Sequence, residues 1–348
     1  MRRHQPIRCG LLGLALASLC GICSAATPGQ KLVKRFTLPA GALVQALAFG
    51  PGGHEAYIAR GSELLAYDAA TGQMTGTLAL SGTVVDIAID PEHATGYALL
   101  ADPARLASFG LRPLHLLWQQ SLGGGTPKAM LYDSEARAVF IEHVHGSGLD
   151  KVDATSGRLL GALNLSGTLG QMAIDERGTL YVTDGSNDAI DAVDEAHMSD
   201  LGAIPLSACK NPSGLAMDPV GRRLFVGCAD GTRAVIDTDM GFTFEHLPSS
   251  MRGASRMLFA FHPFGAGGWK GAAIGVAAND RLTLIRMLAF VKYVAAGDDP
   301  LPWHCEAMAM DPVTHQPWLA IGGTSDVGKG ANKTAELWTL GQAEGARP

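Results

Sequence analysis

Long hydrophobic runs and clustered basic residues are both scarce in this sequence. After residue 26 no stretch reaches about 18 apolar residues without a charge, which excludes a membrane-spanning helix there. The 27 Lys and Arg residues are outnumbered by 33 Asp and Glu residues and form no basic stripe, so nucleic-acid binding is not expected. Because 47% of the residues are hydrophobic, the chain can still bury a large core.

The motifs of the common catalytic sites are also missing. The chain has no G-x-S-x-G, no H-E-x-x-H and no phosphate-binding loop, and the glycines of residues 123–127 open no helical pattern. Asp-Pro pairs recur, but they fall at expected turns, where the carboxylate accepts bonds from backbone N–H groups. We therefore predict no catalytic residue and no cofactor.

Two histidines are candidate metal ligands. His143 and His145 stand two residues apart at the end of an apolar run, so their side chains point to the same face of a strand. A third ligand would have to come from Glu142, Asp184 or His304, and no spacing in the sequence brings these together. We predict ordinary hydrogen-bonded histidines and no metal site.

Residues 1–26 have the three parts of a secretory signal. Arg2, Arg3 and Arg8 come first, an apolar run covers residues 11–19, and small residues occupy positions 24–26. We expect cleavage near Ala25 or Ala26 and a mature protein that is periplasmic or secreted. Loss of the three arginines would change the formal net charge from −6 to −9.

Three cysteines follow this segment: Cys209, Cys228 and Cys305. Cys209 precedes one predicted strand and Cys228 ends the strand antiparallel to it, so we expect a disulfide across this hairpin and a buried free thiol at Cys305. A reactive or metal-binding pair is the alternative. It is disfavoured because there is no C-x-x-C spacing and no neighbouring histidine.

One phrase, apolar-Ala-apolar-Asp-Pro, recurs along the chain and defines its organisation. The Asp-type positions are 50, 90, 133, 175, 218, 262 and 311, so successive units are 40 to 49 residues apart. Each unit contains apolar runs of about five residues separated by turn residues, and no helical pattern interrupts them. This period predicts four-stranded units arranged around an axis.

Individual units differ in ways that lead to further expectations. Residues 31–39 alternate like an edge strand and are expected to complete the last unit, which lacks an outermost strand. The second unit lacks the Asp-x-x-Thr-Gly turn, so its outer strands are expected to be irregular, and residues 265–271 lengthen the sixth. The methionines of the inner strands are expected to fill the core: Met130, Met172, Met217 and Met310.

The run LYVTD of residues 180–184, its turn and the following Val-Asp resemble the repeat of the YVTN-repeat (YncE-like) seven-bladed β-propellers, which are exported bacterial proteins. The likeness covers residues 31–342 and includes LAMDPVGRRLFVGC in the fifth unit. It implies an all-β, WD40-like fold: a seven-bladed β-propeller with four-stranded antiparallel blades and the N-terminal strand completing the last blade. Residues 27–342 would form this single domain, and residues 343–348 a polar tail.

In such a propeller the starts of the inner strands and the ends of the second strands share one face, the top face, where ligands usually bind. Asp102 and Asp230 also fall at second-strand ends, and a solvated rim is the alternative interpretation of the whole set. The predicted binding residues are Gln45, Arg60, Asp86, Lys128, His143, His145, Gln171, Asp184, Ser213, Arg256, His304 and Glu306.

These patterns together predict an exported, non-catalytic module that binds or organises other molecules through its top face. Its partner would be a small-molecule ligand or a periplasmic protein. The alternative is a periplasmic hydrolase or lyase, with or without a metal, that uses top-face histidines and carboxylates.

Overall fold

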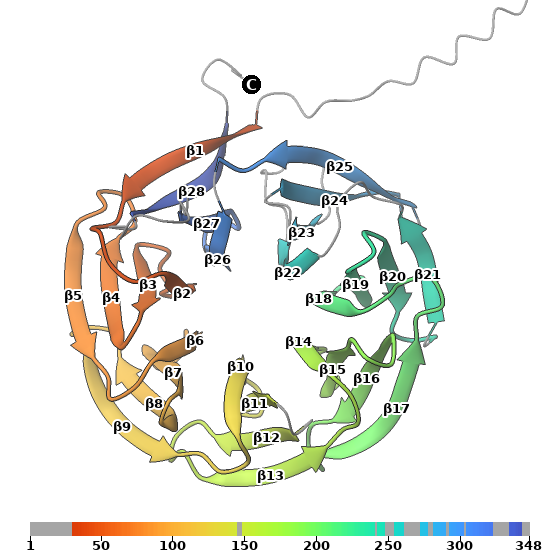
Figure 1. The fold of residues 1–348 in the computed structure, drawn as a ribbon, viewed down its shortest axis with the longest axis horizontal. Helices are drawn as coiled ribbons and strands as arrows, with labels where there is room; N and C mark the ends of the chain where they lie inside the picture. Colours follow the sequence, from red (N-terminus) through yellow and green to blue (C-terminus); the bar gives the residue numbers. More distant parts are fainter. Residues whose placement is uncertain are drawn as a thin grey trace, which may run out of the picture.

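The computed structural model describes residues 30–144, 148–240, 242–247, 254–260, 272–277, 281–289, 292–302, 304–322 and 334–342. In these residues the strands form seven four-stranded sheets, which are arranged in a ring around a central axis (Figure 1). Strands that are neighbours in a sheet run antiparallel, as β2 does with β3 and β3 with β4. The expected signal of residues 1–26, His145, the insertion of residues 265–271 and the tail of residues 343–348 lie outside the described residues.

Each sheet, or blade, contributes one strand to each of four concentric positions. The inner strands are β2 (Val44–Phe49), β6 (Val84–Asp90), β10 (Thr126–Asp133), β14 (Leu169–Ile174), β18 (Pro212–Asp218), β22 (Ala254–Ala260) and β26 (His304–Met310). The second strands are β3 (Glu55–Arg60), β7 (Thr95–Ala101), β11 (Ala138–Val144), β15 (Thr179–Asp184), β19 (Arg223–Cys228), β23 (Ala272–Ala277) and β27 (Pro317–Gly322). The third strands are β4 (Glu63–Asp68), β8 (Ala104–Gly110), β12 (Gly148–Asp153), β16 (Ala189–Asp194), β20 (Arg233–Asp237), β24 (Arg281–Ala289) and β28 (Ala335–Gln342). The outer strands are β5 (Met74–Ala79), β9 (His115–Ser121), β13 (Leu159–Asn164), β17 (Ser199–Pro205), β21 (Phe242–Leu247), β25 (Lys292–Pro300) and β1 (Gln30–Thr37).

Burial explains the different sequence patterns of the strands. Every residue of β27 is buried, and so are five of the six residues of β3, because neighbouring blades cover both faces of a second strand. These strands therefore read as continuous apolar runs. The outer strands β5 and β13 alternate between exposed and partly buried positions, since one face meets solvent.

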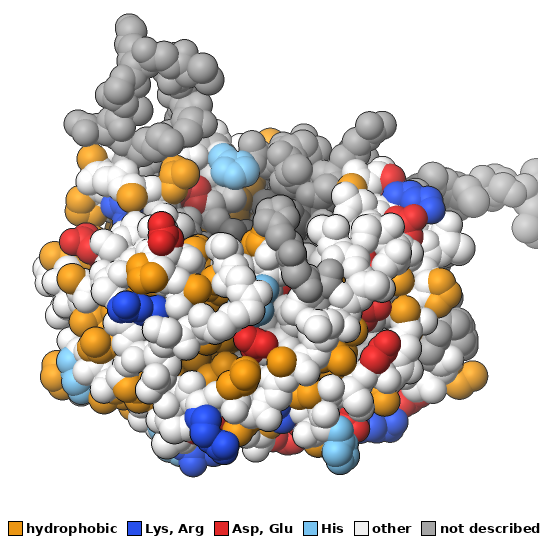
Figure 2. Space-filling view, turned by 60° about the horizontal axis from the view of Figure 1, so that its bottom comes forward, with side chains coloured by type: hydrophobic (Ala, Val, Ile, Leu, Met, Phe, Trp, Pro, Cys, Tyr) orange, Lys and Arg blue, Asp and Glu red, His pale blue; other side chains and the backbone are white. Residues whose placement is uncertain are grey.

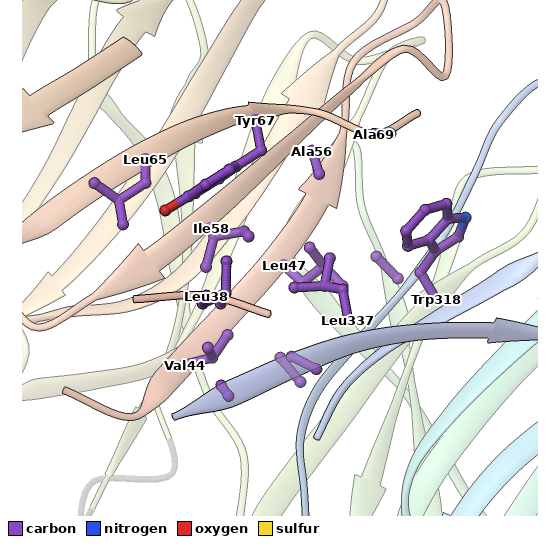
Figure 3. Packing of buried hydrophobic residues seen from close by; sticks show 14 of the residues in the cluster. Leu38, Val44, Leu47, Ala56, Ile58, Leu65, Tyr67, Ala69, Trp318 and Leu337 are labelled. Atoms are coloured by element: carbon purple, nitrogen blue, oxygen red, sulfur yellow. The ribbon is translucent and has the colours of Figure 1, made fainter. Parts of the chain in front are cut away.

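The hydrophobic core lies between adjacent blades. One cluster joins Leu47 and Ile58 of the first blade to Trp318 and Leu337 of the last, as Figure 3 shows. In the same cluster the rings of Phe49 and Trp318 lie with their centroids 5.2 Å apart. Packing between blades thus supplies the stabilisation that a single four-stranded sheet lacks.

Residues 31–39 contribute the closing strand, as their alternation predicts. β1 pairs antiparallel with β28, with Leu32 opposite Leu340, and the order of that sheet is β1-β28-β27-β26. The N–H of Leu38 then donates to the carbonyl of Ala335 at 2.8 Å. The start of the described chain therefore covers the edge that its last strand would otherwise expose.

The recurrent Asp residues set the turns that follow the inner strands, which confirms their structural interpretation. Asp90 Oδ1 accepts bonds from the N–H groups of Glu92 and His93, and Asp311 Oδ1 accepts from Val313 and Thr314. The expectation of irregular outer strands in the second unit is wrong. β8 and β9, of seven residues each, form six residue pairs, and the register shift between Ser108 and Phe109 also has counterparts in the outer pairs of other blades. The turn of residues 111–114 takes the place of the missing motif. No helix in the described part of the chain is long and apolar enough to cross a membrane.

Candidate functional site

A β-bulge interrupts each inner strand near its start, at the top face. The pairing register shifts between residues 44 and 46, 84 and 86, 127 and 129, 169 and 172, 212 and 214, 254 and 256, and 305 and 307. A bulge leaves a residue unpaired and re-aims its side chain. The residues skipped by these shifts include Gln45, Lys128, Gln171, Ser213 and Glu306, all of which belong to the predicted binding set.

A cavity of about 720 Å³ lies at the centre of the ring, lined by the inner strands of all the blades. Its wall is mainly apolar and includes five methionines: Met130, Met172, Met257, Met308 and Met310. The polar side chains that line it are Asp86, Lys128, Glu142, Thr168, Gln171, Asn211 and Ser213. Four of the predicted binding residues, Asp86, Lys128, Gln171 and Ser213, therefore meet in one place. Met130, Met172 and Met310 line this cavity as well as packing against their blades, whereas Met217 lies in a core cluster.

Several polar side chains at the top face connect one blade to the next. Asp86 Oδ2 accepts a bond from Met130 N at 2.9 Å, and Glu306 Oε2 accepts one from Val44 N at 2.8 Å. Gln171 Oε1 accepts from Leu215 N and Met257 N, both at 3.0 Å, while its Nε2 donates to Met257 O at 2.7 Å. Gln45 instead binds within its own blade, accepting from Gly61 N at 2.9 Å. The top-face ring is thus largely a set of bonds between blades.

A charged group stands on one side of the cavity. Lys128 Nζ donates to Glu142 Oε1 at 2.8 Å and to the carbonyl of Leu169 at 2.5 Å. Glu142 is 1% exposed, and its second oxygen, Oε2, has no hydrogen-bond partner among the described residues. Burial raises the pKa of Glu142, the Lys128 ammonium opposes this rise, and the nearby Asp86 carboxylate adds to it. The cavity therefore contains a buried acid with an unused acceptor.

The predicted side chains at the ends of the second strands form hydrogen bonds within the protein. Arg60 donates to the carbonyls of Ala42 and Pro39, and buried His143 Nε2 lies 2.9 Å from Asp150 Oδ2. Asp184 is 1% exposed, and its carboxylate accepts bonds from the backbone and side chains of residues 186 and 187 and from the N–H of residue 168. Arg60 thus fixes the segment that leads into β2, His143 pairs with a third-strand acid, and Asp184 holds the turn that follows its own strand.

The expected disulfide joins Cys209 to Cys228, with Cα atoms 5.4 Å apart. It closes a loop with 18 residues between the cysteines, which stabilises the fold by about 3 kcal/mol in the chain-entropy description. Cys305 is buried and takes no part in this disulfide, also as predicted, and its Sγ donates to the carbonyl of Ala307.

The remaining predicted residues do not gather into a site in the described structure. His304 is exposed at the start of β26, and Asp102 and Asp230 are exposed beyond second strands. Arg256 stands opposite Val276 in its blade, and its side chain lies outside the described part. In that part no group of three His, Cys, Asp or Glu residues is placed to hold a metal ion. Lys and Arg side chains stand apart from one another on the face in Figure 2.

Sequence reasoning overlooked the role of Glu142 in the cavity. The sequence suggests Glu142 only as a third metal ligand beside His143 and His145, yet Glu142 lines the cavity together with Lys128 across the β10–β11 pair. The strand AVFIEHV contains this single acid, beside His143, among five apolar residues, and that contrast is the sequence feature that identifies it.

Comparisons with known proteins identify the architecture. No family model matches the chain, and no curated protein matches its sequence. The fold is similar to that of a chain in the crystal structure of the mitotic checkpoint complex, with a TM-score of 0.70 and 10% identity over 97% of this chain and 99% of that one. The WD40 repeats of RRP9 give a TM-score of 0.71 at 8% identity, over 91% of this chain and 98% of that one. The U3-55K structure gives 0.67 at 8%, over 90% and 98%. At these identities the likeness concerns the fold alone, and the chain has the fold of the WD40-like β-propellers.

Proposed function

We propose that this protein is an exported β-propeller that binds a ligand or a protein partner through its top face and central cavity. The cavity carries the proposal, because its size suits a small organic molecule and its apolar wall is combined with a few polar groups at one place. The bulges support it, since they turn Lys128, Gln171 and Ser213 toward the axis in successive blades.

The fold and the cysteines give two lines of support. One similar chain belongs to the structure of a complex, so a propeller of this architecture is found there as part of an assembly. The Cys209–Cys228 disulfide suits an oxidising compartment, where such bonds persist, and this agrees with the export signal expected in residues 1–26. The YVTN-repeat family remains a sequence resemblance in this proposal.

Photo-crosslinking in cells that make the protein tests the function. A photoreactive amino acid at Ser213, which lines the cavity, should crosslink a specific protein, or native mass spectrometry of the purified chain should show a bound small molecule. The matched position is Val220, which is 71% exposed in the turn at the opposite end of the same blade. The proposal would be contradicted if crosslinking at position 213 did not exceed crosslinking at position 220 and no bound small molecule was found. Cell fractionation in the same cells checks the export.

A further inference from the structure

The central cavity is polar near the top face and apolar further along its axis. Lys128 and Gln171 line it close to the starts of their inner strands. Nearer the ends of the inner strands its wall has the partly exposed apolar side chains of Ile89, Leu131 and Met310. A volume of about 720 Å³ lies in the range of pockets that hold small organic molecules. A ligand with a polar head and an apolar body therefore fits this arrangement.

Lys128 presents an accessible hydrogen-bond donor to the cavity. Its side chain is 43% exposed, whereas the side chain of Glu142 beside it is 2% exposed. A lysine ammonium has three N–H donors. Two of them bond to Glu142 Oε1 and to the Leu169 carbonyl, and the third has no partner among the described residues. A ligand in the cavity can therefore reach one unused donor.

The ion pair of Lys128 with Glu142 decides which head group suits this donor. Lys128 Nζ lies 2.8 Å from Glu142 Oε1, so the charge of the ammonium is already balanced. An anionic head group at Nζ would be repelled by the adjacent carboxylate, and a cationic one would be repelled by the ammonium itself. An uncharged oxygen, such as that of a carbonyl group, accepts the third N–H bond without either repulsion.

We propose that the cavity binds an uncharged apolar molecule with a carbonyl oxygen, which accepts a hydrogen bond from Lys128 Nζ while the apolar body lies along the channel. Ketones, esters and quinones belong to this class. This inference rests on the proposed function, because it specifies the ligand class of the same cavity. In this arrangement Glu142 positions the ammonium group and does not touch the ligand.

Calorimetry on the purified chain, with four naphthalenes of similar shape, tests the head group. 2-Acetylnaphthalene has the carbonyl oxygen, 2-isopropylnaphthalene has no acceptor, 2-naphthoate is an anion and 1-(2-naphthyl)ethylamine is a cation. We expect the ketone to bind at least about tenfold more tightly than each of the others, as the gain of one hydrogen bond to a charged donor predicts.

Variants at the ion pair identify the donor. Lys128→Met removes the N–H groups and keeps an unbranched side chain, so the affinity of the ketone should fall to that of 2-isopropylnaphthalene. Glu142→Gln keeps the donor, so the ketone should retain its advantage. Because Lys128→Met alone leaves buried Glu142 without its cation, the double variant Lys128→Met/Glu142→Gln repeats the comparison without an unpaired acid.

Lys34→Met is the matched control. Lys34 also pairs with a glutamate, Glu336, and its side chain is 44% exposed, but it lies on β1 and does not line the cavity. This variant should leave the affinity of the ketone unchanged. Should the variants at Lys128 fail to fold by circular dichroism, infrared spectra of 2-acetylnaphthalene bound to the unmodified protein give a second measurement. Its carbonyl stretch should lie at a lower frequency than in hexane, because a hydrogen bond weakens the C=O bond.

The proposal is overturned if none of the compounds binds, if the hydrocarbon, the anion or the amine binds as well as the ketone, if the double variant keeps the advantage of the ketone, or if the carbonyl stretch of the bound ketone is unshifted. A crosslink from position 213 together with any of these results would leave the proposed function standing and remove only this ligand class.

Discussion

At the scale of single residues, Asp191 is a buried acid whose charge opposes folding. It is 8% exposed on β16, and its Oδ2 has no hydrogen-bond partner in the described chain. Burial, together with the carboxylates of Asp184 and Asp200, raises its pKa to about 6. The folded protein thus holds this proton more tightly than the unfolded chain, so the free energy of unfolding falls as the pH rises from about 4 to about 6.

We expect Asp191→Asn to remove this loss, which is about 3 kcal/mol for a shift of this size. Urea unfolding of both proteins should give similar stability at pH 4 and a more stable variant at pH 7.5. Asp200→Asn changes an exposed neighbouring carboxylate and should keep most of the pH slope. Parallel loss of stability in wild type and Asp191→Asn would contradict the assignment.

The repeat places Asp191 on a third strand but does not show what faces it. Asp150 occupies the equivalent place in the preceding blade, where His143 is its partner. In the blade of Asp191, Asp184 occupies the position equivalent to His143. This blade therefore has two acids where the preceding blade has an acid and a histidine. The replacement of His143 by Asp184 can be read from an alignment of the units. The burial that raises the pKa of Asp191 can be seen only in the folded structure.

At the scale of elements, Gln171 joins three inner strands. From its bulge on β14 it bonds to Leu215 on β18 and to both backbone groups of Met257 on β22. Replacement by alanine leaves two buried backbone N–H groups without this acceptor, so we expect Gln171→Ala to lower the free energy of unfolding by about 1–3 kcal/mol. Chemical denaturation measures the change. Gln73→Ala alters an exposed turn residue and should cost little, and equal effects of the two variants would refute the role of Gln171.

The strands were predictable from the sequence, but bonds of this kind between them were not. Apolar runs and Asp turns located the inner strand of each unit because those signals are local in the chain. Gln171 and Met257 are 86 residues apart, and only the ring brings them together. In the second unit the missing turn motif predicts irregular outer strands, but pairing of β8 with β9 and packing between blades order these strands without that motif.

At the scale of the whole molecule, the cavity could be located from the sequence only in part. The positions of Asp86, Lys128, Gln171 and Ser213 followed from the repeat. The partnerless oxygen of Glu142 did not, because it depends on how a second-strand side chain packs against the channel. Similarity to other propellers does not predict this feature of Glu142 either, because at identities of 8–10% the similarity concerns the fold alone.

The ring as a whole depends on β1, which comes from the opposite end of the chain to its partner β28. Removal of residues 27–38 takes away this strand and buried Leu38, so β28 is left as an unpaired edge beside exposed apolar residues. We expect the shortened chain to lose thermal stability and to self-associate, which size-exclusion chromatography with light scattering detects. A synthetic peptide of residues 30–38 should restore the monomer by adding a strand to the open edge, while a scrambled peptide should not. A shortened chain that stays monomeric with unchanged melting would show that the other strands hold the ring closed without β1.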